Sequence, residues 1–329
     1  MSLTFAFAGL RHGHIFPLYE KVKDSPDMEI AAVCEEDPEH SLLKTYPDIA
    51  LTHTDFDLML KEVPCDVVAI GDYYAKRGSL AIRALKAGKH VIADKPLCIS
   101  LDELAQIKAL AEEKNLKVGC MYELRSIANL NLVRKMIRDG LLGKLVQIQF
   151  SAQHPLQRGT RPCWYFEEGK HGGTINDIAS HAIDILPVLT GCSITKIHAA
   201  RSWKALAGEG DFMKDASQIM LELSNGCGVM GDVSYSGVDV MGFALPTYWR
   251  FNVWGSKGMV ECTLSGDVRF YGETASEVQN LSSAGEESMD YLASFVADIA
   301  GEDVELDTAA VLESTRMTLE IQKAADEAE

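Results

Sequence analysis

A lysine at the end of an apolar segment is the first residue of this sequence that could carry chemistry. The segment HVIADKPLCIS predicts a strand over residues 90–93, and Lys95 lies just beyond its carboxyl end. Pro96 restricts Lys95 to extended geometry, which fixes the direction in which the lysine leaves the strand. A loop lysine is usually solvated surface. In α/β sheets, however, ligands bind beyond the carboxyl ends of the strands, so Lys95 is a candidate catalytic residue.

A second set of polar residues lies in HGGTINDIASHAIDIL, residues 171–186. If residues 174–190 are helical, Asp177 and His181 are four apart on one face, with Asp184 one turn further on. An imidazole can take a hydroxyl proton as hydride leaves the same carbon, and a carboxylate can orient it or hold a neighbouring hydroxyl. The plain alternative is a buried helical histidine bonded by the preceding turn. We expect no metal site, because no third ligand with recognisable spacing accompanies this pair.

The stretch FAGLRHGHIF, residues 7–16, lies where dinucleotide-binding proteins place G-x-G-x-x-G. Gly9 ends the first predicted strand, as the first glycine should. Arg11 stands at the second glycine and His14 at the third, while Gly13 is one residue out of register. The stretch is therefore either a cofactor loop in altered form or an ordinary strand-to-helix turn.

Glu35 ends the second predicted strand, where dinucleotide-binding folds place an acid that accepts hydrogen bonds from the adenosine ribose. A carboxylate there repels a 2′-phosphate, which favours NAD over NADP. NADP is not excluded, because Arg11 and Arg77 could supply charge for a phosphate. The alternative is that residues 35–37 are a solvated acidic cluster near a helix start.

The elements that must position these residues alternate in type up to about residue 120. Strands are predicted at 3–8, 29–34, 66–70, 90–93 and 117–121, and helices at 14–24, 38–45, 75–87 and 101–114. Ser100 with Glu103 forms a capping-box pattern, and Gly88 follows a helix as its stop. Such alternation predicts an α/β doubly wound parallel sheet of the Rossmann type.

After about residue 145 the pattern changes to long strand-like runs joined by turn pairs such as Asn225-Gly226. Helices are expected near 173–190, 286–300 and 307–327. We therefore predict an α/β domain over residues 1–121 and, over 122–329, an α+β domain with a large, mostly antiparallel sheet, whose C-terminal helices can pack back on the first domain.

The composition and net charge of the chain indicate which classes of partner the protein can bind. The 329 residues are 47% hydrophobic with a formal charge of −17, which disfavours nucleic acid and anionic membranes and favours a small-molecule partner. The eight cysteines show none of the paired spacing of metal knuckles or redox dithiols. Without a signal peptide or a membrane-spanning run, the expected location is the cytoplasm.

With these motifs in view, the chain resembles the Gfo/Idh/MocA family of nicotinamide-dependent oxidoreductases. ALKAGKHVIADKPL resembles the family's AL-x-AGKHV-x-x-EKP-L, with Asp94 in place of glutamate. HGGTINDIASHAIDIL resembles GGG-x-x-x-D-x-G-x-H-x-x-D. Arg125, followed by LVRKMIRDGLLGK, resembles the arginine that opens the second domain, and WGSKGMVEC resembles a late hairpin.

The resemblance implies hydride transfer between nicotinamide and a sugar, an inositol-like polyol or a related hydroxylated metabolite. Lys95, His181 and Asp177 then fall on the catalytic positions. The resemblance also implies that residues 1–121 form a Rossmann domain that binds the dinucleotide and that the sheet of the second domain is open-faced. The exposed face of that sheet would form a homodimer or homotetramer. Cofactor contacts are expected from Gly9, Arg11, His12, Gly13, His14, Glu35, Asp72, Tyr73, Arg77, Asp94, Lys95 and Pro96. Substrate contacts are expected from Arg125, Asp177, His181 and the aromatic residues Trp164, Tyr165, Tyr248 and Trp249, for which core packing is the alternative.

Several departures from the family pattern keep other functions open. The first loop is poor in glycine, and the family's T-P-N-x-x-H becomes DYYAKR at residues 72–77. His171 and Ala179 replace glycines around the Asp177 segment. A sensor that binds a sugar or nucleotide without turnover is therefore an alternative. Another is a nicotinamide enzyme in which oxidation is transient and the net reaction is not redox.

Overall fold

The computed structural model describes residues 2–40, 42–245, 248–274, 276–286 and 288–328. The chain divides into two compact units. The first comprises Met1–Met121, Gly159–Gly172 and Tyr291–Arg316, and the second Tyr122–Arg158, Gly173–Asp290 and Met317–Glu329. The sequence-based division kept residues 122–329 together, whereas the structure groups two later segments with the first unit. Each unit is described by itself.

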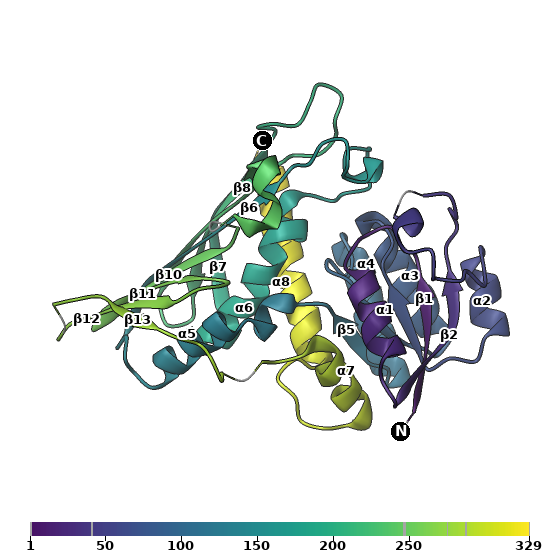
Figure 1. The fold of residues 1–329 in the computed structure, drawn as a ribbon, viewed down its shortest axis with the longest axis horizontal. Coiled ribbons are helices and arrows are strands. Elements are labelled where there is room, and N and C mark those ends of the chain that lie inside the picture. The colour runs from purple at the N-terminus through teal and green to yellow at the C-terminus, as the bar shows by residue number, and fades with distance from the viewer. Residues whose placement is uncertain (1, 41, 246–247, 275, 287, 329) are drawn as a thin grey trace. The chain divides into compact units, whose positions relative to one another are not determined.

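The first unit contains a five-stranded parallel sheet in the order β2-β1-β3-β4-β5 (Figure 1). Its strands are β1 Leu3–Ala8, β2 Met28–Cys34, β3 Val67–Ile70, β4 His90–Ala93 and β5 Val118–Cys120. All four residues of β3 are buried, as expected for a strand covered on both faces. The predicted doubly wound parallel sheet is confirmed.

Helices of the first unit fall mostly where the sequence predicts them. They are α1 Ile15–Lys23, α2 Phe56–Glu62, α3 Tyr74–Lys86, α4 Leu101–Lys114, α7 Tyr291–Ala300 and the first part of α8 Thr308–Glu327. Ser100 caps α4 as predicted, accepting hydrogen bonds from the amides of Asp102 and Glu103. The helix predicted at 38–45 is wrong. Among the residues of this range that the structure describes, 38–40 and 42–45, only a 3-10 turn at Leu43–Thr45 forms, and it has no buried residue to anchor a longer helix.

The chain reverses its direction of winding between β1 and β3 of this sheet. From β1 it moves outward to β2, while from β3 it proceeds the other way to β4 and β5. Right-handed crossovers then place α1 on one face and α3 and α4 on the other, as Figure 1 shows. The loops after β1 and β3 diverge at this switch point, which is where open α/β sheets bind ligands.

The second unit contains an eight-stranded sheet in the order β13-β12-β11-β10-β6-β9-β8-β7. Its strands are β6 Leu145–Pro155, β7 Ile194–Trp203, β8 Ala216–Leu223, β9 Gly228–Gly237, β10 Arg250–Gly255, β11 Gly258–Thr263, β12 Val268–Gly272 and β13 Gln279–Leu281. β6 and β9 are parallel, whereas the other pairs are antiparallel. The predicted mostly antiparallel sheet is confirmed.

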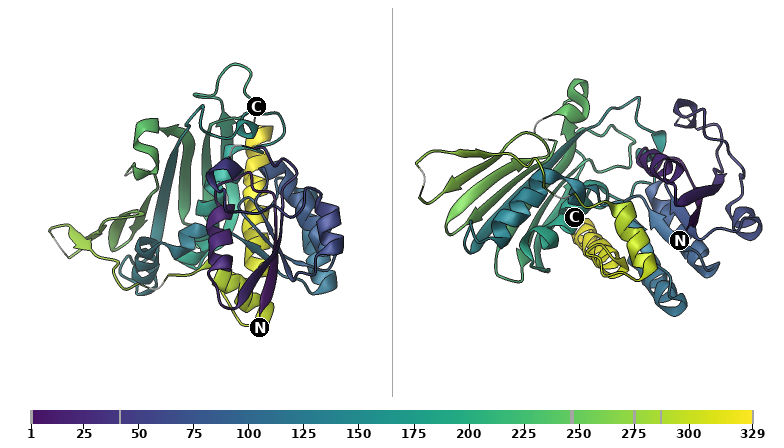
Figure 2. Two further views of the ribbon diagram at one scale, coloured as in Figure 1. Left: turned by 45° about the vertical axis from the view of Figure 1, so that its right-hand side comes forward. Right: turned by 60° about the horizontal axis from the view of Figure 1, so that its bottom comes forward.

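One face of this sheet is covered and the other is exposed. α5 Ala128–Arg138 and α6 Ser180–Thr190 belong to the covered side, and Figure 2 shows them beside the sheet. Met220 and Met230, which pair across β8 and β9, are 46% and 49% exposed on the opposite face. None of the described helices is both long and apolar enough to cross a membrane.

Candidate functional site

Gly9 lies at the end of β1 and brings the first loop against the loop after β3. Its φ is +72°, a conformation that favours glycine. A Cβ added there would lie 2.5 Å from Cβ of Asp72, so no side chain fits. The first glycine of the altered fingerprint is therefore required for packing at the switch point.

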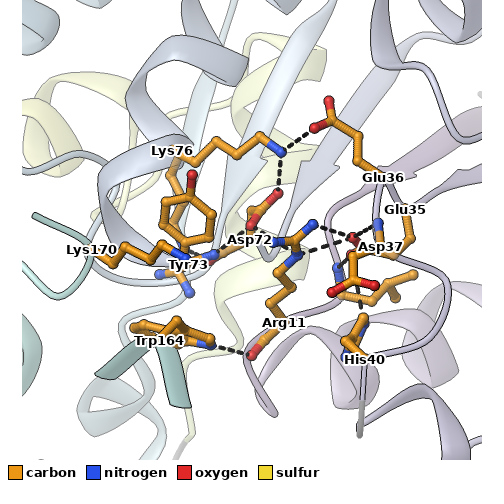
Figure 3. Close-up of polar contacts among 12 residues, drawn as sticks. Arg11, Glu35, Glu36, Asp37, His40, Asp72, Tyr73, Lys76, Trp164 and Lys170 are labelled. Carbon is orange, nitrogen blue, oxygen red and sulfur yellow. Dashed lines mark hydrogen bonds and ion pairs between the residues drawn. The ribbon is translucent and has the colours of Figure 1, made fainter. Parts of the chain in front are cut away.

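Arg11 crosses from this loop to Glu35 at the end of β2 (Figure 3). Its Nε and Nη2 donate to Oε1 of Glu35 at 3.0 and 2.9 Å, and its Nε lies 3.5 Å from Oδ1 of Asp72. Glu35 also accepts hydrogen bonds from the amides of Leu10 and Asp37 and has no exposed surface. Burial by itself would lower the pKa of Arg11, but Asp72 and Glu35 together raise it. The carboxylate expected to bind ribose is thus fully engaged within the protein.

The backbone of the same loop is only partly available to a phosphate. The amides of Arg11 and His12 both donate to the carbonyl of Gly71, at 3.1 and 3.0 Å. At Gly13, in contrast, an added Cβ would meet nothing within 4 Å, so the loop is open on that side at the start of α1. These residues fit a dinucleotide on one condition: Arg11 must release Glu35 before a ribose can bind there.

Tyr73, at the start of α3, is surrounded by three cations. The charged groups of Arg11, Lys76 and Lys170 lie 5.6, 5.9 and 5.2 Å from its ring centroid, as Figure 3 shows. Lys76 also contacts Asp72 at 3.1 Å and Glu36 at 2.6 Å. Arg11, one of the two arginines expected to serve a phosphate, and Lys76 are therefore balanced by carboxylates of the same sheet edge.

Arg77 is completely buried beneath the carboxyl ends of β3 and β4. Its Nε donates to the carbonyl of Asp72 at 2.7 Å, its Nη1 to the carbonyl of Lys95, and its Nη2 to Oδ2 of Asp94 at 2.8 Å. The guanidinium has no exposed surface here and is engaged by protein groups, so its expected contact with the cofactor stays a prediction. Arg77 fixes the loop that carries Lys95 and Pro96, which are joined by a cis peptide bond.

Lys95 itself is 2% exposed, with its Nζ 5.8 Å from the ring centroid of Tyr74. The lysine predicted at the carboxyl end of β4 is therefore enclosed rather than solvated. Trp164 and Tyr165 also belong to the first unit and are stacked at 4.1 Å between ring centroids. Trp164 donates its indole N–H to the carbonyl of Arg11 at 3.0 Å, so this pair packs on the altered loop.

The loop after β1 also places two histidines on Asp94. His12 Nδ1 contacts Oδ2 and His14 Nδ1 lies 3.2 Å from Oδ1. Burial lowers the pKa of His12 to about 3, despite the carboxylate, so its imidazole is neutral near pH 7. Burial alone would raise the pKa of Asp94, but Arg77 and then His12 and His14 hold it well below its usual range. The sequence analysis did not predict this cluster.

In the second unit, Asp177 lies in a π-helical turn at Ile175–Ala179 that leads into α6, on which His181 lies. The helix predicted over residues 174–190 forms, and it includes this π-helical turn before α6. Gln322 accepts hydrogen bonds from the amides of Ile175 and Asn176 and so holds the start of the turn. π-turns are frequent at functional sites. Asp177 and His181 are 2% and 5% exposed.

Arg125, expected to contact substrate, forms a two-point ion pair with Asp184 of α6. Its Nε and Nη2 each lie 2.7 Å from a carboxylate oxygen, and the two residues are 3% and 1% exposed. This pair fixes the helix that carries His181, and a contact of Arg125 with substrate stays a prediction.

Trp249 lies edge-on to His181, with ring centroids 6.2 Å apart. Tyr248 lies 4.8 Å from the ring of His154, a residue of β6 that the sequence analysis did not select. The signal available in the sequence was the alternation of apolar residues along β6, which places His154 on the covered face of the sheet. The proposed residues thus form two groups, with Lys95 in the first unit and Asp177 and His181 in the second.

The fold and its sheet-edge residues define a class: a two-unit protein with a dinucleotide-type α/β sheet and an open-faced α+β sheet. The family model for the NAD-binding Rossmann fold of the GFO/IDH/MocA oxidoreductases matches residues 3–122, and that for the family's C-terminal domain matches residues 130–261. The chain belongs to the Gfo/Idh/MocA family of oxidoreductases, and its first domain is an NAD-binding Rossmann fold.

Individual relatives are distant. D-xylose dehydrogenase of Paenarthrobacter nicotinovorans is 21% identical over 57% of this chain and 52% of its own. Among solved structures, an oxidoreductase of Thermotoga maritima has a TM-score of 0.86 at 19% identity, covering 99% of both chains. An inositol dehydrogenase homologue of Azotobacter vinelandii, complexed with NAD+, has a TM-score of 0.81 at 16% identity, covering 99% of this chain and 96% of the other. The sequence matches to three of the curated relatives, D-xylose dehydrogenase among them, span 39%, 46% and 52% of the relative's own length.

Proposed function

We propose that this protein is an NAD-linked dehydrogenase or reductase acting on the CH–OH group of a sugar, an inositol-like polyol or a related hydroxylated metabolite. The observation that carries the proposal is the enclosure of Lys95 at the carboxyl edge of the parallel sheet, two residues beyond the end of β4. The dehydrogenase named among the relatives supports the substrate class.

In this proposal Lys95 polarises the reacting oxygen, His181 exchanges its proton, and Asp177 holds an adjoining hydroxyl. The loop at Gly9 and Gly13, and Glu35 once Arg11 releases it, would hold NAD, which would supply the hydride acceptor. Lys95 and His181 belong to separate units, so the proposal requires that they meet at one substrate. Tyr248 and Trp249 would offer aromatic faces to its C–H groups.

The remaining expectations are part of the same proposal. The partner is a small molecule, and the exposed face of the eight-stranded sheet, with Met220 and Met230, forms a homodimer or homotetramer interface. Large exposed apolar groups on one sheet face suit such a contact. The location is the cytoplasm.

The test combines binding with turnover. NADH fluorescence titration of the wild type is expected to saturate, and a panel of sugars, polyols and sugar acids is expected to give NAD-dependent absorbance change. Lys95→Met should greatly reduce turnover and leave NADH affinity nearly unchanged. Lys108→Met, which alters an exposed lysine of α4, is the matched control. Equal turnover in the wild type and Lys95→Met would remove Lys95 from the mechanism.

A second candidate function is supported by the hydrogen bonds that the Glu35 carboxylate already makes within the protein. Because Arg11 and two backbone amides occupy its oxygens, this edge of the sheet is satisfied without a ribose. A sensor that binds a sugar without turnover would keep this arrangement. Failure to bind NADH at millimolar concentration, with a thermal shift produced by a sugar, would favour it.

A further inference from the structure

Three side chains with the chemistry of metal ligands converge at the carboxyl edge of the parallel sheet. Among the residues that the structure describes, His12, His14 and Asp94 each offer one ligand atom, and these atoms all lie within 4.8 Å of one another. The two imidazole rings have centroids 4.5 Å apart and are inclined by 76°. Both direct Nδ1 at the same carboxylate.

The spacing is close to what a tetrahedral ion needs. With bonds of about 2.0–2.2 Å, neighbouring ligand atoms lie about 3.4 Å apart. The separation of His14 Nδ1 and Asp94 Oδ1 is already 3.2 Å. All three ligand atoms lie within 4.8 Å of one another, so the remaining separations require side-chain adjustment when an ion binds.

The surroundings resemble the outer shell of a metal site, in which both imidazoles and carboxylates are oriented by further hydrogen bonds. Arg77 holds Oδ2 of Asp94 at 2.8 Å, which leaves Oδ1 directed at His14. Nε2 of His12 lies 3.2 Å from the hydroxyl of Tyr74, which in turn contacts the hydroxyl of Tyr165 at 2.9 Å. The side chain of His14 is 35% exposed and provides an access path from solvent.

We propose that His12, His14 and Asp94 bind one first-row transition dication of the Zn²⁺ type. Two imidazoles and one carboxylate are donors that such ions prefer, and three protein ligands leave a position open for water or a substrate oxygen. Arg77 shares the carboxylate and repels a cation, so we expect reversible rather than permanently retained binding. This inference goes beyond the proposed dehydrogenase function and does not depend on it.

The test uses Zn²⁺ alone with full-length, untagged protein previously treated with EDTA. Isothermal titration calorimetry is expected to show that one Zn²⁺ binds per chain. Addition of Co²⁺ in place of Zn²⁺ is expected to give the visible absorption bands of a tetrahedral Co²⁺ site. His14→Ala should weaken Zn²⁺ binding at least about 100-fold, and Tyr74→Phe about 10-fold, since losing one outer-shell partner usually costs 10–100-fold. His198→Ala, which changes an exposed histidine of β7, is the matched control and should bind like the wild type.

Absence of saturable Zn²⁺ binding to the wild type, or equal affinity in His14→Ala, would overturn the proposal and leave a purely hydrogen-bonded cluster. Circular dichroism of each variant separates loss of ligands from loss of fold. NADH titration of the same samples is read separately, so failure of the dehydrogenase proposal and failure of the metal site are distinguishable.

Discussion

Arg11 and Glu35 form a two-point ion pair across the loops that follow β1 and β2, with donor–acceptor distances of 3.0 and 2.9 Å. The pair is more than a surface contact, because Glu35 has no exposed area and Arg11 replaces the glycine that usually approaches a diphosphate. The acid that would discriminate between NAD and NADP is thus neutralised by the protein itself.

Removal of this cation should sharpen cofactor choice. In Arg11→Met the carboxylate of Glu35 faces the position of a 2′-phosphate without compensation. We expect the ratio of the NADPH to the NADH dissociation constant to rise up to about tenfold, which corresponds to about 1.4 kcal/mol of added repulsion. Fluorescence titrations measure the ratio. Glu35→Gln should lower it, and one ratio shared by all three proteins would contradict this account.

Two glycines of the same loop should respond differently to alanine. Gly9→Ala places a Cβ against Asp72 in a left-handed conformation, and we expect the free energy of unfolding to fall by about 2–4 kcal/mol. Gly13→Ala meets open space and should change it by less than about 0.5 kcal/mol. Urea denaturation measures both. The idea that Gly9 is needed for packing fails if the two variants are equally stable.

The Arg125–Asp184 pair should behave as a buried structural ion pair. Arg125→Met removes the guanidinium that pairs with the buried Asp184 carboxylate, which we expect to cost about 3–5 kcal/mol of unfolding free energy. The double variant Arg125→Met/Asp184→Leu should recover most of that loss. If it also recovers turnover, Arg125 positions α6. Full stability without turnover would instead point to direct contact with substrate.

His90 should contribute a pH-dependent part of the stability. Burial lowers the pKa of His90 by more than the nearby Asp66 carboxylate raises it. In addition, Nδ1 of His90 accepts a hydrogen bond from the amide of Lys117 at 2.9 Å. The unfolded chain therefore binds the proton more readily than the folded protein. Stability is present above a pH of about 6.5 and is lost as the pH falls below it.

Thermal unfolding between about pH 5 and pH 8 tests this sign. His90→Asn keeps an acceptor for the Lys117 amide but cannot be protonated in this range. Its melting temperature should therefore fall less between pH 7 and pH 5 than that of the wild type. The same decrease in both proteins would show that His90 is not responsible.

Local pattern was sufficient for much of the first unit. Short buried runs alternating with helical segments predicted the parallel sheet, and Ser100 marked the start of α4 because its side chain caps the adjacent amides. Because the predicted strand over residues 90–93 ends just before Lys95, the sequence also indicated that this lysine lies at the carboxyl edge of the sheet. These features depend on residues that are close in sequence, so the sequence by itself determines them.

The partners of the site residues were decided by the tertiary structure. Arg11 meets Glu35 across 24 residues, Asp94 meets His12 across 82, and Arg125 meets Asp184 across 59. Parallel strands deliver their loops to one edge of the sheet, but which loops become neighbours depends on strand order, which local periodicity does not contain. For this reason the sequence showed the loop that contains His12 and His14 separately from the segment that contains Lys95. Only the fold brought Asp94 between the two histidines and Arg77.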